Sequence, residues 1–197
     1  GMVSLPGGLV MGLLGPAVGR AYDARGTRPL IIPGSILITI GMMGFAALEQ
    51  TEHLFSWVGS GTWPAFVQLM LVTVVLNLGI ALMMTPLMSN ALAAVPDSLA
   101  SHAQAILNTL QQVAGGAGTA IFVAVMTFAS TRYASSNAEE LASLGATDPA
   151  LAEAQVVGQG IHVAFLVAAF AAVVLMVASA FLKLDAKDSA HPGAPKN

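Results

Sequence analysis

The sequence predicts an all-α membrane protein, a bundle of five transmembrane helices followed by a short polar tail. Three observations predict this class. Hydrophobic residues make up 56% of the 197 residues and charged residues only 9%, whereas about a quarter of the residues of a soluble domain are charged. The charges gather in short zones, and the apolar runs between them are close to the ~20 residues that a spanning helix needs. The 20 Gly and 10 Pro also suit packed membrane helices.

The first two apolar runs lie on either side of a charged hairpin. The first, about 2–19, carries no charge and is just long enough to cross the hydrocarbon core. Because no Lys or Arg precedes it, we expect a membrane span here and not a secretory signal. The second, about 30–48, ends where Glu49 and Glu52 follow. Each run is expected to form one transmembrane helix.

Two longer runs follow, joined by a tight turn. The third span covers about 64–94, and Pro86 is the expected kink because proline lacks the N–H of a helical hydrogen bond. The Pro-Asp-Ser sequence at 96–98 is typical of a turn that starts a helix. The fourth span is therefore expected from about 99 to 130.

A polar segment separates the fourth span from the fifth. Residues 133–155 hold four acidic side chains, and their Ala and Leu content allows a short surface helix. The fifth span is expected at about 156–182. Residues 183–197 have too little apolar surface to offset the entropy of ordering. They are expected to form a disordered cytoplasmic tail.

The basic residues predict the orientation in the membrane. Of the seven Lys and Arg residues, all but Arg132 lie either between residues 20 and 28 or after residue 182. Five crossings place these two regions on the same side, which the positive-inside rule predicts to be cytoplasmic. The C-terminus is then cytoplasmic as well.

The hairpin between the first two spans carries the strongest local motif. Gly19 allows close approach of backbones, and Gly26 supports a turn with positive φ. Asp23 is placed to pair with Arg20 or Arg28. On physical grounds alone, two interpretations are about equally good. The hairpin is either a latch that is made and broken, or a set of topogenic arginines beside a solubilising aspartate.

Four residues of this hairpin carry a family resemblance. Gly19, Asp23, Gly26 and Arg28 match all four fixed positions of the signature G-x-x-x-D-x-x-G-x-R, and the chain resembles the major facilitator superfamily in this motif. In that family the motif lies in a cytoplasmic loop between the second and third helices, with a weaker copy in the second half. The resemblance implies that this chain is part of the C-terminal half of a major-facilitator fold, with a latch at the hairpin.

A second resemblance narrows the family. Residues 108–120, with Pro86 and the turn after Val95, are similar to the fourteen-spanning drug:proton antiporters. The resemblance implies proton-coupled export of hydrophobic small molecules by alternating access, in the inner membrane of a bacterial cell. Such proteins have twelve or fourteen spans and this chain offers five. We therefore expect a C-terminal fragment whose partner is the missing N-terminal half of the same transporter.

Small residues at four-residue spacing predict where the helices pack. They let a neighbouring helix approach closely, and the resulting faces serve either static packing or rocking between states. Besides the motif glycine Gly19, they lie in the first and fourth spans: Gly8, Gly12, Gly15, Gly115, Gly116 and Thr119.

Uncharged polar and soft apolar residues inside the spans are the candidates for lining a solute cavity. A polar side chain is costly in lipid unless it faces protein or water. The alternative role for the amides is hydrogen bonding between helices, which buried amides commonly do. The candidate lining residues are Asn77, Gln104, Asn108, Gln111, Gln112 and Phe122.

The remaining chemistry excludes several function classes. The 7 Lys and Arg against 10 Asp and Glu do not make a basic surface, so no nucleic-acid partner is expected. With no Cys and no metal-ligand spacing among the four His, we expect no metal and no cofactor. No H-E-x-x-H motif or intramembrane Asp pair is present, so we expect no enzyme and no catalytic residue.

The expected function is transport across the lipid bilayer. None of the ten carboxylates lies in the middle of a span, so this chain alone is not expected to couple protons. In the antiporters that the chain resembles, the coupling carboxylate is usually carried in the N-terminal half. The alternative from another class is a membrane scaffold or assembly module that does not transport and acts through its glycine-rich helix faces.

Overall fold

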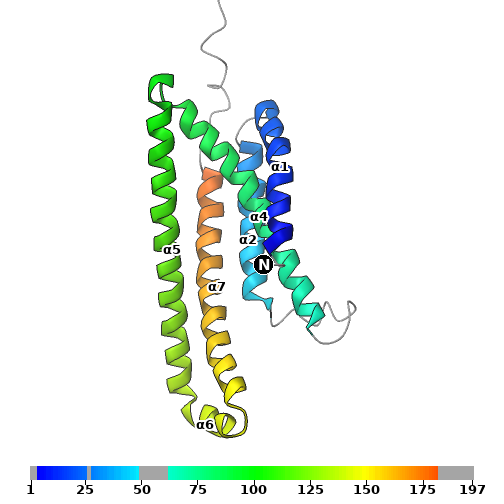
Figure 1. Cartoon of the computed structure of the whole chain (residues 1–197), viewed down its shortest axis with the longest axis vertical. Helices are drawn as coiled ribbons and strands as arrows, with labels where there is room; N and C mark the ends of the chain where they lie inside the picture. Colours follow the sequence, from blue (N-terminus) through cyan, green and yellow to red (C-terminus); the bar gives the residue numbers. More distant parts are fainter. Residues whose placement is uncertain (1–3, 26–27, 49–61, 182–197) are drawn as a thin grey trace, which may run out of the picture.

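The computed structural model describes residues 4–25, 28–48 and 62–181, and nearly all of them are helical (Figure 1). The described part contains six α-helices and one 3-10 turn. They are α1 (Ser4–Arg25), α2 (Arg28–Ala46), α4 (Trp63–Ala93), η2 (Asp97–Leu99), α5 (Ala100–Ser136), α6 (Ala138–Thr147) and α7 (Pro149–Phe181). The predicted tail, 183–197, lies outside the described residues.

Four of these helices, α2, α4, α5 and α7, are long and apolar enough to cross a membrane. Together with the helical content, they confirm the prediction of an all-α membrane protein. The 22-residue α1 is less apolar than these four and does not meet the same criterion over its described residues. A fifth crossing through α1 therefore stays a prediction.

The polar segment between the last two spans is helical for most of its length. It forms the ten-residue α6, with Glu139 and Glu140 in its first turn, where acidic side chains stabilise a helix N-terminus. The Asp148 carboxylate then accepts a hydrogen bond from the Leu151 N–H at 3.0 Å at the start of α7. Helix α7 begins seven residues before the predicted start of the fifth span, because Ala, Leu, Glu and Gln in residues 149–155 favour helix. Helix α5 also continues past its predicted end, to Ser136.

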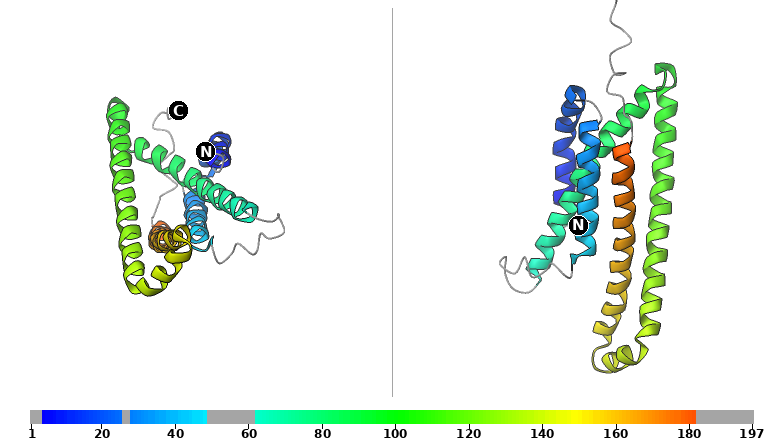
Figure 2. Two further views of the ribbon diagram at one scale, coloured as in Figure 1. Left: turned by 60° about the horizontal axis from the view of Figure 1, so that its bottom comes forward. Right: turned by 180° about the vertical axis from the view of Figure 1, so that it is seen from behind.

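Helix α2 lies at the centre of the packed part of the molecule, against α4 and α7 (Figure 2). Glycine lets α2 and α4 touch through their backbones. A Cβ added to Gly79 of α4 would lie 2.7 Å from the Ile38 nitrogen and 2.9 Å from the Gly34 oxygen of α2. A Cβ on Gly41 would meet Leu76 at 3.0 Å. Side chains larger than hydrogen at these places would force the two helices apart.

Hydroxyl groups join α2 to α7. The Ser35 and Ser179 hydroxyl oxygens are 3.0 Å apart, and both residues are buried. The Thr39 hydroxyl shares its one proton between two carbonyl oxygens, that of Ser35 in its own helix at 2.9 Å and that of Ala172 in α7 at 3.2 Å. In a lipid environment such bonds replace those that water would make. They hold α2 and α7 in one register.

Three phenylalanines connect the C-terminal end of α2 to the middle of α5 and α7. Phe45 and Phe165 are stacked with ring centroids 4.8 Å apart, and Phe122 meets Phe165 edge to face at 5.1 Å. Such aromatic pairs contribute about 0.5–1.5 kcal/mol beyond the area they bury. The cluster places the middle of α5 level with the C-terminal end of α2.

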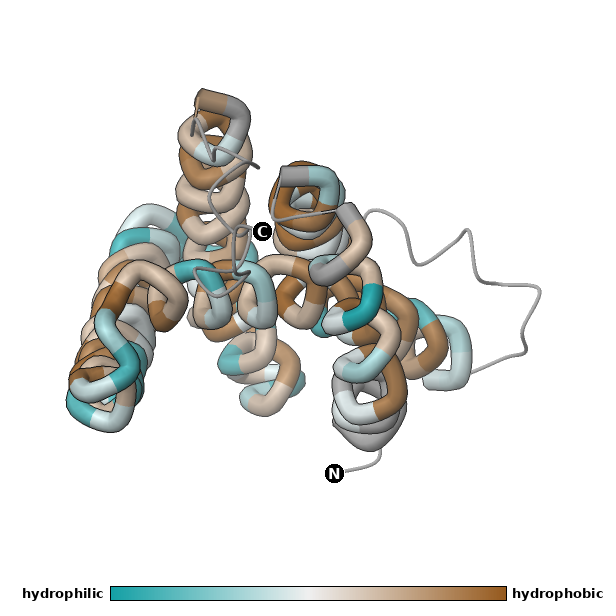
Figure 3. Tube along the Cα trace, turned by 90° about the horizontal axis from the view of Figure 1, so that it is seen from above, coloured by the Kyte–Doolittle hydropathy of each residue, from teal (hydrophilic) through white to brown (hydrophobic). Residues whose placement is uncertain are grey.

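Helix α5 is much less enclosed than α2. It packs against α7 along one side, and none of its residues is buried. Where Gly160 of α7 meets α5, an added Cβ would clash with the Ser130 hydroxyl oxygen and would lie 2.6 Å from the Met126 carbonyl oxygen. Figure 3 shows that hydrophobic residues recur around the helices, on their outward sides as well as between them. A surface of this kind suits lipid or further protein.

Candidate functional site

Three of the predicted cavity-lining residues come together on α5, facing the end of α4. The Gln104 amide nitrogen donates to the Asn108 side-chain oxygen at 3.1 Å. The Gln111 amide nitrogen donates to the Met84 sulfur of α4 at 3.5 Å. Spacings of four and three residues place these amides on one side of the helix. We call Gln104, Asn108, Gln111 and Gln112 the amide face.

The amide face lies inside the spanning part of α5. At ~1.5 Å per residue, its four residues lie about 6–18 Å along the axis from the first residue of the helix. Asn108, Gln111 and Gln112 are exposed and Gln104 is half-buried. The sequence from residue 100 to 122 contains no Asp, Glu, Lys or Arg. The face is therefore polar and uncharged, in the first third of a helix that is long and apolar enough to span a membrane.

Two other predicted lining residues make different contacts. The Asn77 amide nitrogen donates to the Thr73 carbonyl oxygen of its own helix at 2.8 Å, which occupies one of its donors locally. Phe122 belongs to the aromatic cluster and lines a separate groove between α5 and α7. Among the described residues, the predicted polar lining residues make two side-chain contacts, Gln104 with Asn108 and Gln111 with Met84.

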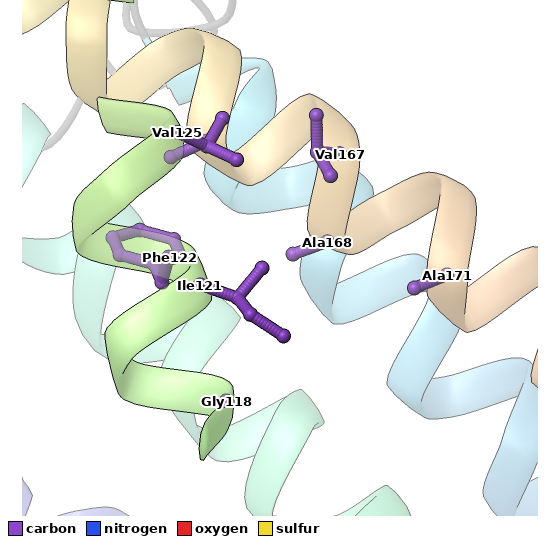
Figure 4. A pocket seen from close by; sticks show the side chains of 8 residues that line it. Gly118, Ile121, Phe122, Val125, Val167, Ala168 and Ala171 are labelled. Atoms are coloured by element: carbon purple, nitrogen blue, oxygen red, sulfur yellow. The ribbon is translucent and has the colours of Figure 1, made fainter. Parts of the chain in front are cut away.

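The groove between α5 and α7 has a volume of about 270 Å³ and is lined by hydrocarbon groups (Figure 4). Two helices contribute four residues each to it. From α5 these are Gly118, Ile121, Phe122 and Val125, and from α7 they are Ala164, Val167, Ala168 and Ala171. No side chain among these eight carries a hydrogen-bonding group. An acyl chain or an apolar side chain fits its chemistry, and an ion does not.

The predicted latch motif spans the joint between α1 and α2. Only residues 26 and 27 separate the two helices, which agrees with the short hairpin that we expect. Arg20 is exposed and its Nε donates to the Pro16 carbonyl oxygen at 3.3 Å. Gly26 and the side chains of Asp23 and Arg28 lie outside the described residues. The pairing of Asp23 with an arginine stays a prediction.

The small residues of α1 and α5 face open space. A Cβ added to any of their described glycines would have no atom within 4 Å, and Thr119 donates to the Gly115 oxygen of its own helix at 2.9 Å. The open positions are Gly8, Gly12, Gly15, Gly19, Gly115, Gly116 and Gly118. Close backbone contact occurs instead at glycines of α2, α4 and α7. The predicted packing faces of α1 and α5 are thus not used by the described part of this chain.

Sequence reasoning missed the hydroxyl contacts between α2 and α7. Ser35 and Thr39 are four residues apart in an apolar run, which was a detectable signal by the same rule that selected the amides. Their partners on α7 could not be read from spacing, because the contacts join residues more than 130 positions apart. Among the described residues, no group of three His, Asp or Glu could hold a metal ion.

The fold and the site together define an integral membrane protein built from apolar helices, with an uncharged polar face inside one of them. Comparison with the sequences of known proteins narrows this class to a family. Lincomycin resistance protein LmrB of Listeria innocua is 37% identical over 133 residues, which are 68% of this chain and 26% of that protein.

Two further relatives come from other bacteria. The uncharacterized MFS-type transporter YcnB of Bacillus subtilis is 33% identical over 184 residues, 93% of this chain and 33% of that protein. Puromycin resistance protein pur8 of Streptomyces alboniger is 31% identical over 161 residues, 78% of this chain and 29% of that protein. This chain belongs to the major facilitator superfamily.

The match confirms the resemblance carried by the hairpin motif. The chain spans about a quarter to a third of the length of these curated relatives. No family model matches the chain, and no solved structure matches it.

Proposed function

We propose that this chain is the C-terminal part of an exporter that moves drugs or other hydrophobic small molecules by alternating access, coupled to protons. Its similarity to lincomycin and puromycin resistance proteins over most of its length carries this proposal. The apolar helices with one uncharged polar face support it, because a solute path needs polar groups where the surroundings are lipid.

The open faces of α1 and α5 support a larger assembly. Glycine stripes on both helices have room for a neighbouring helix, and α5 has no buried residue. The proposed neighbour is the N-terminal half of the same transporter, rocking against this half around a central cavity. The amide face of α5 would line that cavity. Scaffolding through the same faces is less favoured, because the relatives are named as transporters and resistance proteins.

The joint between α1 and α2 is the proposed latch. Asp23 and Arg28 would pair on the cytoplasmic side in one state and separate in the other, so that their interaction biases the equilibrium between states. The C-terminus would lie on the same side of a bacterial inner membrane, with α1 as the fifth crossing. The five spanning runs carry no Asp or Glu, so the coupling carboxylate is assigned to the N-terminal half.

Efflux by the full-length protein tests this function. The complete reading frame that contains this chain is expressed in bacteria deprived of their own exporters, and intracellular lincomycin and puromycin are measured with and without a proton uncoupler. We expect the protein to lower the accumulation of at least one antibiotic several-fold, and the uncoupler to abolish the difference. Equal accumulation with and without well-expressed protein would refute the proposal.

A further inference from the structure

We infer that the amide face of α5 makes this half of the transporter selective for neutral solutes that carry hydroxyl or amide groups on an apolar body. The inference rests on the proposed function, and it adds the chemical class of the solute. It assigns Gln104, Asn108, Gln111 and Gln112 to solute recognition and Met84 to the contact with the apolar part.

The hydrogen bonds within the face orient the amides and leave groups for a solute. A primary amide has two N–H donors and a carbonyl oxygen that accepts two bonds. The Gln104 bond to Asn108 and the Gln111 bond to Met84 each use one N–H of the glutamine. Since sulfur is a weak acceptor, a solute hydroxyl or carbonyl would be a better partner for Gln111 than Met84 is.

The charge distribution of this half offers no counter-ion to a charged solute. The spanning windows of α2 and α4, Pro29–Ala46 and Trp63–Ala93, contain no Asp, Glu, Lys or Arg. The first charged residue of α5 after Asp97 is Arg132, and in α7 none follows Glu153 up to Phe181. An isolated charge without a counter-ion is far more costly to bury than a hydroxyl that finds an amide.

Met84 is the residue that would contact the apolar part of the solute. Its side chain is 37% exposed next to Gln111, and the thioether is flexible enough to adapt to bodies of different shape. Gly115 follows Gln111 by one turn, and a Cβ there would have no neighbour within 4 Å. A ring or chain can therefore lie flat against α5 while its polar group reaches the amides.

The alternative occupant is a helix of the missing half, held by amide hydrogen bonds. Amides that bind a helix have a structural role, so that removing one would lower the export of every solute together. Amides that bind the solute would instead change which solute is exported. The test therefore compares two solutes of opposite chemistry in the same vesicles.

Export by the full-length protein is measured in everted membrane vesicles with two probes. Chloramphenicol is neutral and carries hydroxyl and amide groups, and tetraphenylphosphonium is a permanent cation without hydrogen-bonding groups. The variants are Gln111→Leu and Gln111→Glu. Thr109→Val is the matched control, because Thr109 is exposed two residues away, points to another side of α5, and bonds to the Ala105 oxygen of its own helix.

We expect the wild type to export chloramphenicol faster than tetraphenylphosphonium. Gln111→Leu should lower chloramphenicol export about fivefold to tenfold, the effect of about one lost hydrogen bond, and should leave any export of the cation within about twofold on the same grounds. Gln111→Glu should raise the ratio of cation to chloramphenicol export about tenfold, since a carboxylate attracts cations. Thr109→Val should leave both rates unchanged.

Three results would overturn the inference while the proposed function stands. They are faster export of the cation by the wild type, an equal loss of both probes in Gln111→Leu, and an unchanged ratio in Gln111→Glu. If neither probe is exported but the antibiotics of the efflux test are, the inference also fails. If those antibiotics are not exported either, the proposed function itself is wrong.

Discussion

The two sides of this bundle use the same small residues in opposite ways. On the α2 side, glycines bring α2 and α4 into backbone contact, and hydroxyl groups join α2 to α7. On the α5 side, and along α1, glycines at similar spacing face open space. The first side is packed within the described part of the chain, whereas the glycines of the second have no neighbour there. Small-residue spacing therefore identifies a packing surface but not what packs on it.

Gly79→Val should have the largest effect, because it disrupts the backbone contact between α2 and α4. A branched side chain there would meet the Ile38 nitrogen and the Gly34 oxygen at less than contact distance, and backbone cannot move aside as a flexible side chain can. We expect full-length protein to lose its monodisperse peak on gel filtration in detergent, with folded yield down about tenfold or more, consistent with a ΔΔG above about 4 kcal/mol.

Gly116→Val is the matched change on the open side. A Cβ at Gly116 meets nothing within 4 Å in this chain, so the variant should keep its folded yield and lose export if the N-terminal half packs there. Equal loss of folded protein in the Gly79 and Gly116 variants would remove the distinction between the two sides.

Asp23→Asn should remove export without removing the fold. It replaces a charge at the end of α1 that is proposed to pair with arginine, and charge-assisted hydrogen bonds are roughly twice as strong as neutral ones. We expect antibiotic efflux to fall to background while the amount of protein in the membrane stays the same. Asp97→Asn, at the exposed turn before α5, is the control and should keep efflux. Normal efflux by Asp23→Asn would exclude the latch.

Ser35→Ala should have the smallest effect. It tests how much the hydroxyl contact between α2 and α7 contributes to stability. It removes the hydroxyl contact with Ser179, and interhelical hydrogen bonds in membranes contribute about 0.6 kcal/mol on average. We expect a small drop in the unfolding temperature of the detergent-solubilised protein and little change in export. The double variant with Ser179→Ala should be no less stable than the single one. Additive losses would show that the two hydroxyls act independently.

Apolar runs bounded by charge coincide with helices in the described part of the chain. The spans expected at 30–48 and 64–94 correspond to α2 (Arg28–Ala46) and α4 (Trp63–Ala93), because hydropathy and charge act locally along the chain. The extension of α5 to Ser136 was not predicted, since its polar end has no periodic signal and its Thr, Tyr and Ser residues are not strong helix formers.

The candidate site was predictable only in part. The amides of α5 were found because a polar residue in lipid is conspicuous at any position. The contact of Gln111 with Met84 depends on how α4 crosses toward α5. Likewise, the spacing of Gly115 and Thr119 could not reveal that α7 contacts α5 elsewhere, where Gly160 of α7 meets Met126 and Ser130 of α5.

The length of α5 has a practical consequence for determining sidedness. Its 37 residues extend ~55 Å, well beyond a hydrocarbon core of ~30 Å, and the hairpin that it forms with α6 and α7 reaches past the end of α2 (Figure 1). The α6 turn is thus a water-exposed marker at the far end from the α1–α2 joint. A peptide tag at α6 and a labelled cysteine at Arg20 would report on opposite faces of the membrane in intact cells.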